Sequence, residues 1–118
     1  MLTLVSGATK TERPDHVGHL IVPRQWHKEG ARRQLIPGRW AMDNGAFSGF
    51  DEKKFFSRLK RSEKYDRTNC KFVCAPDVVG NSDKTFISFY KYYDRIDNLG
   101  WPIAYVLQNG QNPDLVPW

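Results

Sequence analysis

The stretch that decides the fold is Phe72-Val73-Cys74-Ala75-Pro76-Asp77, a short apolar run that ends on a carboxylate. Two other runs have the same form, namely Trp40-Ala41-Met42-Asp43 and Ile103-Ala104-Tyr105-Val106-Leu107-Gln108. Short apolar runs bounded by turn residues are typical of buried strands. In α/β proteins the carboxyl ends of parallel strands form the rim at which ligands bind. If the three runs are parallel strands, Asp43, Asp77 and Gln108 meet on one rim.

The segments between these runs have helical patterns. One helix is predicted to begin after Asp51, its N-cap, with an apolar face made of Phe55, Phe56 and Leu59. A second is predicted to begin at Asn81 or Ser82 and to end at Gly100, which Pro102 follows. Its apolar residues at helical spacing are Phe86, Phe89, Tyr90, Tyr93 and Ile96. From residue 39 the order is thus strand, helix, strand, helix, strand, which implies parallel strands with right-handed crossovers.

The N-terminal part of the chain adds two further strands, predicted over Leu2 to Val5 and over Leu20 to Val22. We therefore expect an α/β fold in which parallel (β/α) units form the N-terminal half of a TIM-type (β/α)₈ barrel. Residues 1–118 would be one partial barrel domain. The last residues, 112–118, have the pattern of a loop that leads to another element, so we expect the chain to be truncated.

Composition favours a folded protein in the cytoplasm. The 118 residues are 40% hydrophobic and 14% aromatic, which suffices for a core. No apolar run approaches the roughly 20 residues of a membrane helix, and the start lacks a secretory pattern. Cys70 and Cys74 have even spacing, which on a strand puts them on one side as free thiols. His16 and His19 are predicted as solvated loop residues, and neither a metal nor a cofactor is expected.

The formal net charge of +5 favours a polyanionic partner such as nucleic acid. One basic group lies in a predicted loop, where a cationic insertion has little structural explanation, and we interpret Arg24, Lys28, Arg32 and Arg33 as nucleic-acid contacts. A second group lies on the first predicted helix, between residues 53 and 64, where a solvated face explains it.

Each polar rim motif also has an ordinary structural explanation. Asn44-Gly45 is a strong hairpin signal, although a helix rather than a return strand follows it. Asp77 stands where a carboxylate can cap the next helix, although Asn81 or Ser82 is better placed to do so. Gln108 precedes a glycine turn and, taken alone, indicates only that turn. The case for a site depends on the same pattern occurring three times.

The motifs together resemble a known family. Asp43-Asn44-Gly45-Ala46-Phe47 is similar to the Asp-Ser-Gly-Gly-Phe/Tyr segment of the tRNA-guanine transglycosylase superfamily. Ala-Pro-Asp-Val-Val-Gly-Asn at residues 75–81, Val-Leu-Gln-Asn-Gly-Gln at 106–111 and Val-Pro-Trp at 116–118 resemble its DNA-modifying branch in phages and bacteria. Enzymes of that branch are pentosyltransferases that exchange guanine in DNA for a 7-deazaguanine base. The resemblance implies a bacterial or phage-infected host cell.

The resemblance also implies roles for the rim residues. Asp43 would be the catalytic carboxylate, either a general acid/base or a close attendant of the ribosyl carbon. Asp77 and Gln108 would read the purine edge, and Asn44 would be a further substrate-binding residue. Phe47 would stack on the ring, for which Gly45 would leave room. An ionised Asp accepts paired N–H donors from a guanine-like edge, and an amide supplies both a donor and an acceptor.

The differences from the family pattern favour DNA over tRNA as the polymer. Asn44 and Ala46 replace the Ser and Gly of the tRNA enzymes, and Ser48 stands where those enzymes usually have Gln. The family's nucleophilic Asp belongs to a later strand, so residues 1–118 would hold the base-recognition half and would be inactive alone. The alternatives are a tRNA-directed base exchanger and a non-catalytic nucleic-acid-binding module. The oligomeric state stays open.

Overall fold

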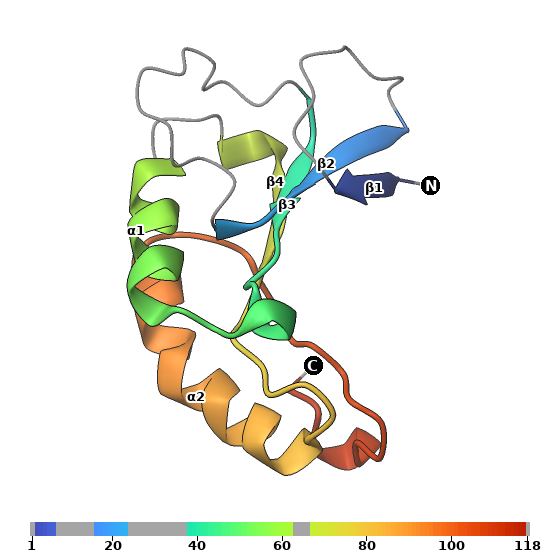
Figure 1. Ribbon diagram of the computed structural model, residues 1–118. Coiled ribbons are helices and arrows are strands. Elements are labelled where there is room, and N and C mark those ends of the chain that lie inside the picture. The colour runs from blue at the N-terminus through green and yellow to red at the C-terminus, as the bar shows by residue number, and fades with distance from the viewer. Residues whose placement is uncertain (1, 7–15, 24–37, 63–66, 118) are drawn as a thin grey trace.

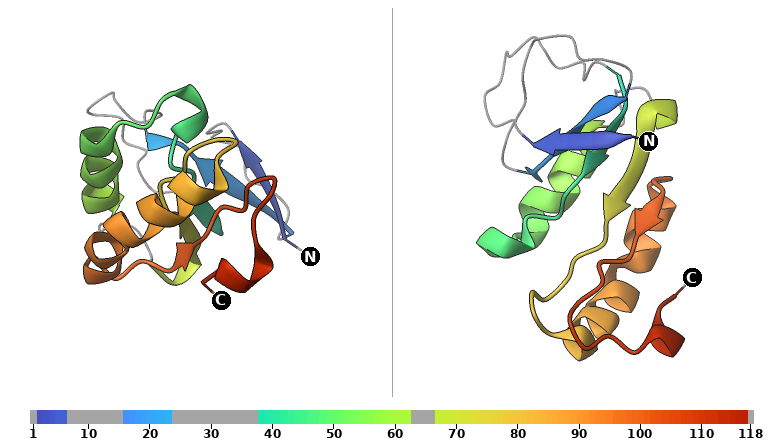
Figure 2. Two further views of the ribbon diagram at one scale, coloured as in Figure 1. Left: turned by 90° about the horizontal axis from the view of Figure 1, so that it is seen from below. Right: turned by 90° about the vertical axis from the view of Figure 1, so that its right-hand side faces the viewer.

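The computed structural model describes residues 2–6, 16–23, 38–62 and 67–117. Within them the chain forms one five-stranded sheet in which every neighbouring pair is parallel and the spatial order is the chain order. The strands are β1 (Thr3–Ser6), β2 (Val17–Ile21), β3 (Trp40–Met42), β4 (Cys70–Cys74) and β5 (Ile103–Ala104). The sheet curls into the arc of a half-barrel, as Figures 1 and 2 show. The expected α/β class is confirmed.

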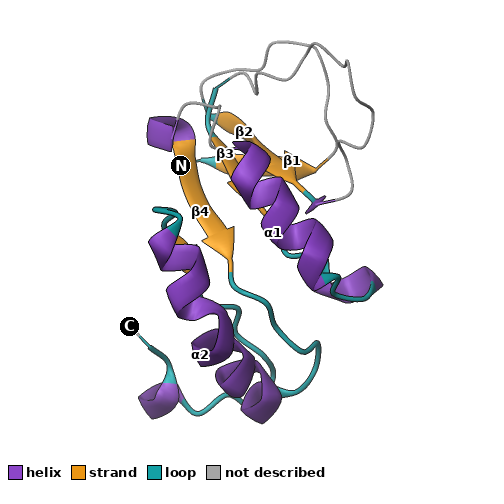
Figure 3. Ribbon diagram, turned by 90° about the vertical axis from the view of Figure 1, so that its left-hand side faces the viewer, coloured by secondary structure: helices purple, strands orange, loops and turns teal. Residues whose placement is uncertain are grey.

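Two helices connect the last three strands and lie on one face of the sheet (Figure 3). Helix α1 (Glu52–Arg61) begins as predicted, because the Asp51 carboxylate accepts a hydrogen bond from the Lys54 N–H. Helix α2 (Ser82–Asn98) is capped in the same way by Asn81, and Gly100 follows it with a φ of 82°. Asp77 therefore does not cap α2, which leaves its carboxylate for other contacts.

The core lies between the sheet and these two helices. From the strands it includes Trp40, Met42 and Val73, which are at most 1% exposed. The helical residues packed against them are Phe55 and Leu59 of α1 together with Phe89, Tyr92 and Ile96 of α2. Aromatic rings join the two helices, since Phe56 of α1 packs against Tyr92 of α2 with ring centroids 5.9 Å apart.

The buried face of α2 differs from the predicted one. Phe89 and Ile96 are buried as expected, but Tyr92 completes the face, whereas Tyr90 and Tyr93 are exposed. Successive residues of a helix point about 100° apart, and aromatic residues occur on more than one side of α2. Their spacing alone therefore does not decide which side of the helix is buried. The Tyr92 hydroxyl, which donates to the Glu52 carboxylate of α1, gives this side of the helix a polar partner as well.

Strand β4 contains an irregularity that corrects the interpretation of the cysteines. Trp40 pairs with Cys70, but Met42 pairs with Val73, so β4 has one residue more than β3 over this stretch. Cys70 and Val73 consequently lie on the helix-facing side, and Cys74 lies on the opposite side. The prediction that the two cysteines share one side was wrong, because alternation holds only for an unbroken strand. Both are free thiols.

His19 also differs from its prediction. It belongs to β2, where it pairs with Trp40, and only 3% of it is exposed. The expectation of a solvated loop residue was wrong because β2 begins three residues earlier than the apolar run at Leu20. His16 precedes β2 and is exposed, as expected.

The loops that follow β3, β4 and β5 gather at the lower end of the molecule in Figure 1. This arrangement is the consequence of parallel pairing, and it is compatible with part of a (β/α) barrel. In the part of the chain described, no helix combines the length and apolar character needed to cross a bilayer.

Candidate functional site at the carboxyl ends of the strands

Three side chains from three different strand ends form one hydrogen-bonded cluster, which we call the rim cluster: Asn44, Asp77 and Gln108. The Asn44 amide Nδ2 donates to Asp77 Oδ1 over 2.7 Å, and the Gln108 amide Nε2 donates to Asp77 Oδ2 over 2.7 Å. Each carboxylate oxygen of Asp77 thus receives one N–H. The two bonded pairs are 33 and 31 positions apart in sequence, and the parallel pairing of β3, β4 and β5 brings them together.

Asn44 is the buried member of the cluster, with 3% of its surface exposed. Its Nδ2 donates also to the carbonyl of Ala75 over 2.8 Å, and its Oδ1 accepts the N–H of Ala46 over 2.7 Å. The orientation of the amide follows from these partners, because its oxygen faces a donor and its nitrogen faces two acceptors. Asn44 therefore joins the end of β3 to the end of β4.

Gln108 is the outer member of the cluster. It lies on the loop after β5, and its Oε1 accepts the N–H of Gly80 over 2.7 Å in an exposed hydrogen bond. Its amide orientation is also fixed by its partners, since the oxygen meets an N–H and the nitrogen meets a carboxylate. Gln108 thereby ties the loop after β5 to the loop that leads into α2.

Asp43 ends the β3 run beside this cluster but does not join it. Its N–H donates to the Ile21 carbonyl, and its side chain is half-buried. Within the described residues nothing donates a hydrogen bond to its carboxylate. The predicted meeting of Asp43, Asp77 and Gln108 is thus seen for Asp77 and Gln108, while Asn44 occupies the third place.

The thiol of Cys74 lies close enough to Asp43 and to Asp77 for both negative charges to act on it. Burial, with smaller contributions from the negative charges of Asp43 and Asp77, raises the pKa of Cys74 to about 12. Cys74 lies on the face of the sheet opposite the helices, directly before the rim. A thiol with so high a pKa stays protonated at neutral pH and is a poor nucleophile. The reactive capacity of this rim lies in its carboxylates.

Phe47 and Gly45 lie in the turn between Asp43 and α1. Gly45 has a φ of 77° and precedes a short 3₁₀-helix over Ala46–Ser48, so its backbone conformation by itself favours glycine. Phe47 is 90% exposed, and Val79 and Leu107 on the two neighbouring rim loops are more than half exposed. The loops after β3, β4 and β5 therefore each present an apolar side chain to solvent.

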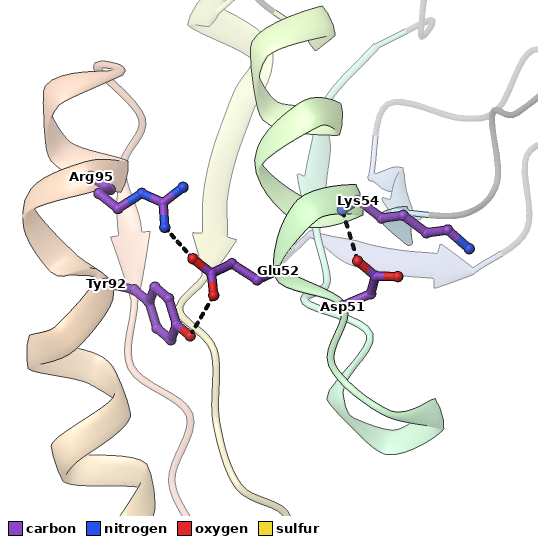
Figure 4. A network of polar contacts seen from close by, with 5 residues as sticks. All are labelled: Asp51, Glu52, Lys54, Tyr92 and Arg95. Atoms are coloured by element: carbon purple, nitrogen blue, oxygen red, sulfur yellow. Dashed lines mark hydrogen bonds and ion pairs between the residues drawn. The ribbon is translucent and has the colours of Figure 1, made fainter.

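A second polar network joins the two helices (Figure 4). The Glu52 carboxylate accepts from Tyr92 Oη over 3.2 Å and forms an ion pair with Arg95, whose guanidinium lies over Phe56. The hydrogen bond from Arg95 holds the pKa of Glu52 below its usual value, with smaller contributions from Tyr92 and Lys91. We call Glu52, Tyr92 and Arg95 the helix network.

A shallow groove of about 650 Å³ lies at the start of α1 and is lined by Gly49, Phe50, Asp51, Glu52, Lys53 and Arg95. It contains two members of the helix network and no member of the rim cluster. Glu52 and Arg95 in its lining pair with each other, and Asp51 caps α1. We regard the rim as the better candidate site, because the Asp43 carboxylate there has no donor among the described residues.

The predicted nucleic-acid contacts Arg24, Lys28, Arg32 and Arg33 lie outside the described residues. In the described part, α1 presents exposed cations at Lys53, Lys54, Lys60 and Arg61. No group of three or more metal-ligating side chains occurs among residues 2–6, 16–23, 38–62 and 67–117.

Sequence reasoning named Asn44 as a residue of the site but did not connect it to Asp77. The sequence holds no signal for this contact, because Asp43, which directly follows β3, and Asn44 are both polar and only the local turn decides which one faces Asp77. Cys74 was not considered as a rim neighbour, since its side of the sheet depends on the β4 irregularity.

Comparison of the chain with models of protein families, with curated proteins and with solved structures gave no match.

Proposed function

We propose that this chain recognises a guanine-type base at the rim of a TIM-type barrel, as the base-recognition half of a pentosyltransferase that exchanges guanine in DNA for a 7-deazaguanine. The observation that carries this proposal is the rim cluster, in which Asp77 is held between two carboxamides. A carboxylate of this kind accepts the paired N–H donors of a guanine edge. The sequence motifs at the same three strand ends resemble those of the transglycosylase superfamily.

Asp43 fits the proposed catalytic role because its carboxylate is half-buried and has no donor among the described residues. A carboxylate without a partner can accept a proton or stabilise a developing positive charge at the ribosyl carbon. Asp77, in contrast, is fully engaged and suits recognition. By the resemblance, the attacking carboxylate comes from a later strand of the barrel, and base exchange is accordingly proposed for the complete barrel.

Phe47 supplies the proposed stacking surface. Its ring is almost fully exposed on the loop that follows Asp43, and base–aromatic stacking contributes roughly 1–3 kcal/mol per base. A guanine in duplex DNA must leave the base stack before it reaches such a site, at a cost of a few kcal/mol. Stacking on Phe47 and pairing with Asp77 would offset that cost.

Calorimetric titration of the chain with guanine and with 7-deazaguanine tests base recognition. We expect both to bind and adenine, which lacks the N1–H donor, to bind much more weakly. Asp77→Asn should weaken guanine binding roughly 10- to 150-fold, because a hydrogen bond to a charged group contributes about 1.5–3 kcal/mol. Glu52→Gln is the matched control, since it removes a carboxylate with two donors elsewhere and should leave the affinity unchanged. Equal affinity for guanine and adenine would contradict the proposal.

Fluorescence anisotropy with duplex DNA and with tRNA tests the polymer. Tighter binding of DNA, together with guanine binding, is expected. The net charge of +5 and the exposed cations of α1 predict that affinity falls steeply with salt for either polymer. Tighter binding of tRNA would favour the tRNA-directed exchanger. Binding of nucleic acid without binding of guanine would favour the non-catalytic module.

A further inference from the structure

The two carboxamides of the rim cluster differ in burial and in the number of their partners. Asn44 makes three hydrogen bonds, two of them to groups of β4 and its following loop, and is 3% exposed. Gln108 makes two, and its contact with Gly80 is exposed to solvent. Water can replace the partners of Gln108 when it turns away, whereas the Ala75 carbonyl beneath Asn44 has no such access.

In the closed cluster a ligand meets an Asp77 carboxylate that is half-buried and already accepts hydrogen bonds from the protein. Both carboxylate oxygens already accept an N–H from the protein, over 2.7 Å in each case. A base that presents two N–H donors to the same two oxygens competes with these amides, and the amide that is held less firmly is the one it displaces. Exchange with Gln108 costs little, because Gln108 is a half-buried loop residue whose other hydrogen bond, with Gly80, is exposed to solvent. Exchange with Asn44 would open the junction between β3 and β4.

We infer that Asn44 is a positioning residue that fixes the Asp77 carboxylate, and that Gln108 is the partner for which an incoming base exchanges. In the free protein Gln108 occupies the place of the base's N–H donor and closes the site. This inference rests on the proposed function for the identity of the ligand. The distinction between a fixed and an exchangeable amide applies to the free protein as well and can be measured without ligand.

The ligand-free experiment measures hydrogen exchange of the side-chain NH₂ groups by NMR of the ¹⁵N-labelled chain. Asn44→Ala and Gln108→Ala assign the two NH₂ signals by their loss. We expect the Asn44 protons to exchange at least tenfold more slowly than the Gln108 protons. Comparable rates would overturn the inference, whatever the protein binds.

The ligand experiment compares guanine with hypoxanthine, which lacks the 2-amino donor. Asn44→Ala should weaken guanine binding about tenfold and abolish the preference for guanine, because Asp77 is no longer held toward the edge. Gln108→Ala should keep the preference and bind guanine as tightly as the unmodified chain or up to severalfold tighter, since no internal amide competes.

Asn81→Ala is the matched control for a structural effect. It removes an Asn that caps α2 and should leave the guanine preference unchanged. A preference retained in Asn44→Ala, or an equal loss in Gln108→Ala, would overturn the inference. Failure of the unmodified chain to bind guanine would instead count against the proposed function, and the exchange rates would then decide the inference alone.

Discussion

The rim cluster and the helix network have the same arrangement of hydrogen bonds but differ in whether the charge of the carboxylate is balanced. In each, one carboxylate accepts hydrogen bonds from two side chains of other elements: Asp77 from Asn44 and Gln108, and Glu52 from Tyr92 and Arg95. The donors of Asp77 are neutral, so the rim keeps a negative charge. Glu52 pairs with a cation, so its charge is balanced within the fold. A carboxylate held by neutral donors keeps its negative charge available to a ligand, whereas the charge of a carboxylate in an ion pair is balanced within the fold.

The largest expected difference between the two regions is in stability. Asn44→Ala removes three buried or part-buried hydrogen bonds and leaves the Ala75 carbonyl without its donor, so we expect a loss of about 2 kcal/mol in the free energy of unfolding. Tyr92→Phe removes one donor from Glu52 and should cost distinctly less. Urea unfolding of both variants measures this difference. Equal losses would mean that the rim cluster holds the strand ends together no more firmly than the helix network holds the helices.

An intermediate effect is expected at the Cys74 thiol, which reports the charge of the rim. Burial is the main cause of the raised pKa of Cys74 and the negative charges of Asp43 and Asp77 add to it, so Asp43→Asn or Asp77→Asn should lower that pKa and increase alkylation at pH 9. Mass spectrometry of the peptides distinguishes Cys74 from Cys70. Glu52→Gln, which removes a balanced charge from the helix network, should change nothing. Unaltered alkylation in the Asp43 variant would place its carboxylate away from the rim cluster.

The smallest effect is expected in the pH dependence of the helix network. The folded-state pKa of Glu52 is lowered, so the stability that it contributes is present above its ordinary pKa near 4.5 and is lost as the pH falls through the folded-state value. Arg95→Gln should remove part of the stability difference between pH 7 and pH 3, measured by urea unfolding. The contribution is small because both side chains are about half exposed. The same acid sensitivity in Arg95→Gln and in the unmodified chain would assign it to other groups.

Much of the fold could be predicted because local rules decide it. The strands at Trp40 and Val73, and the caps Asp51 and Asn81, follow from apolar runs and from side chains that satisfy helix N–H groups. The orientation of α2 could not be predicted from its spacing, since aromatic residues on two sides make Tyr92 and Tyr93 equivalent candidates. Strand β5 is shorter than its apolar run, because its pairing with β4 ends at Ala104 whereas the run continues to Leu107.

The candidate site could be predicted in its location more than in its contacts. Parallel strands bring polar residues at their ends to one rim, and Asp77 and Gln108 meet there as expected. That Asn44 rather than Asp43 contacts Asp77 depends on the direction of two adjacent side chains at the end of β3. Such a direction is set by the local turn at Gly45 and by the neighbouring strand, neither of which a sequence pattern specifies.

The additional residue in β4 has a consequence for how chains of this kind can vary. Up to Cys70 the strand is in step with β3, and from Val73 onward it is in step again with one residue added. Deleting a single residue between them would restore plain alternation, with Val73 still opposite Met42 and Cys74 still on the face away from the helices. A chain that retains this rim can therefore have one residue fewer at this point, and an alignment of such chains should place the gap between Cys70 and Val73.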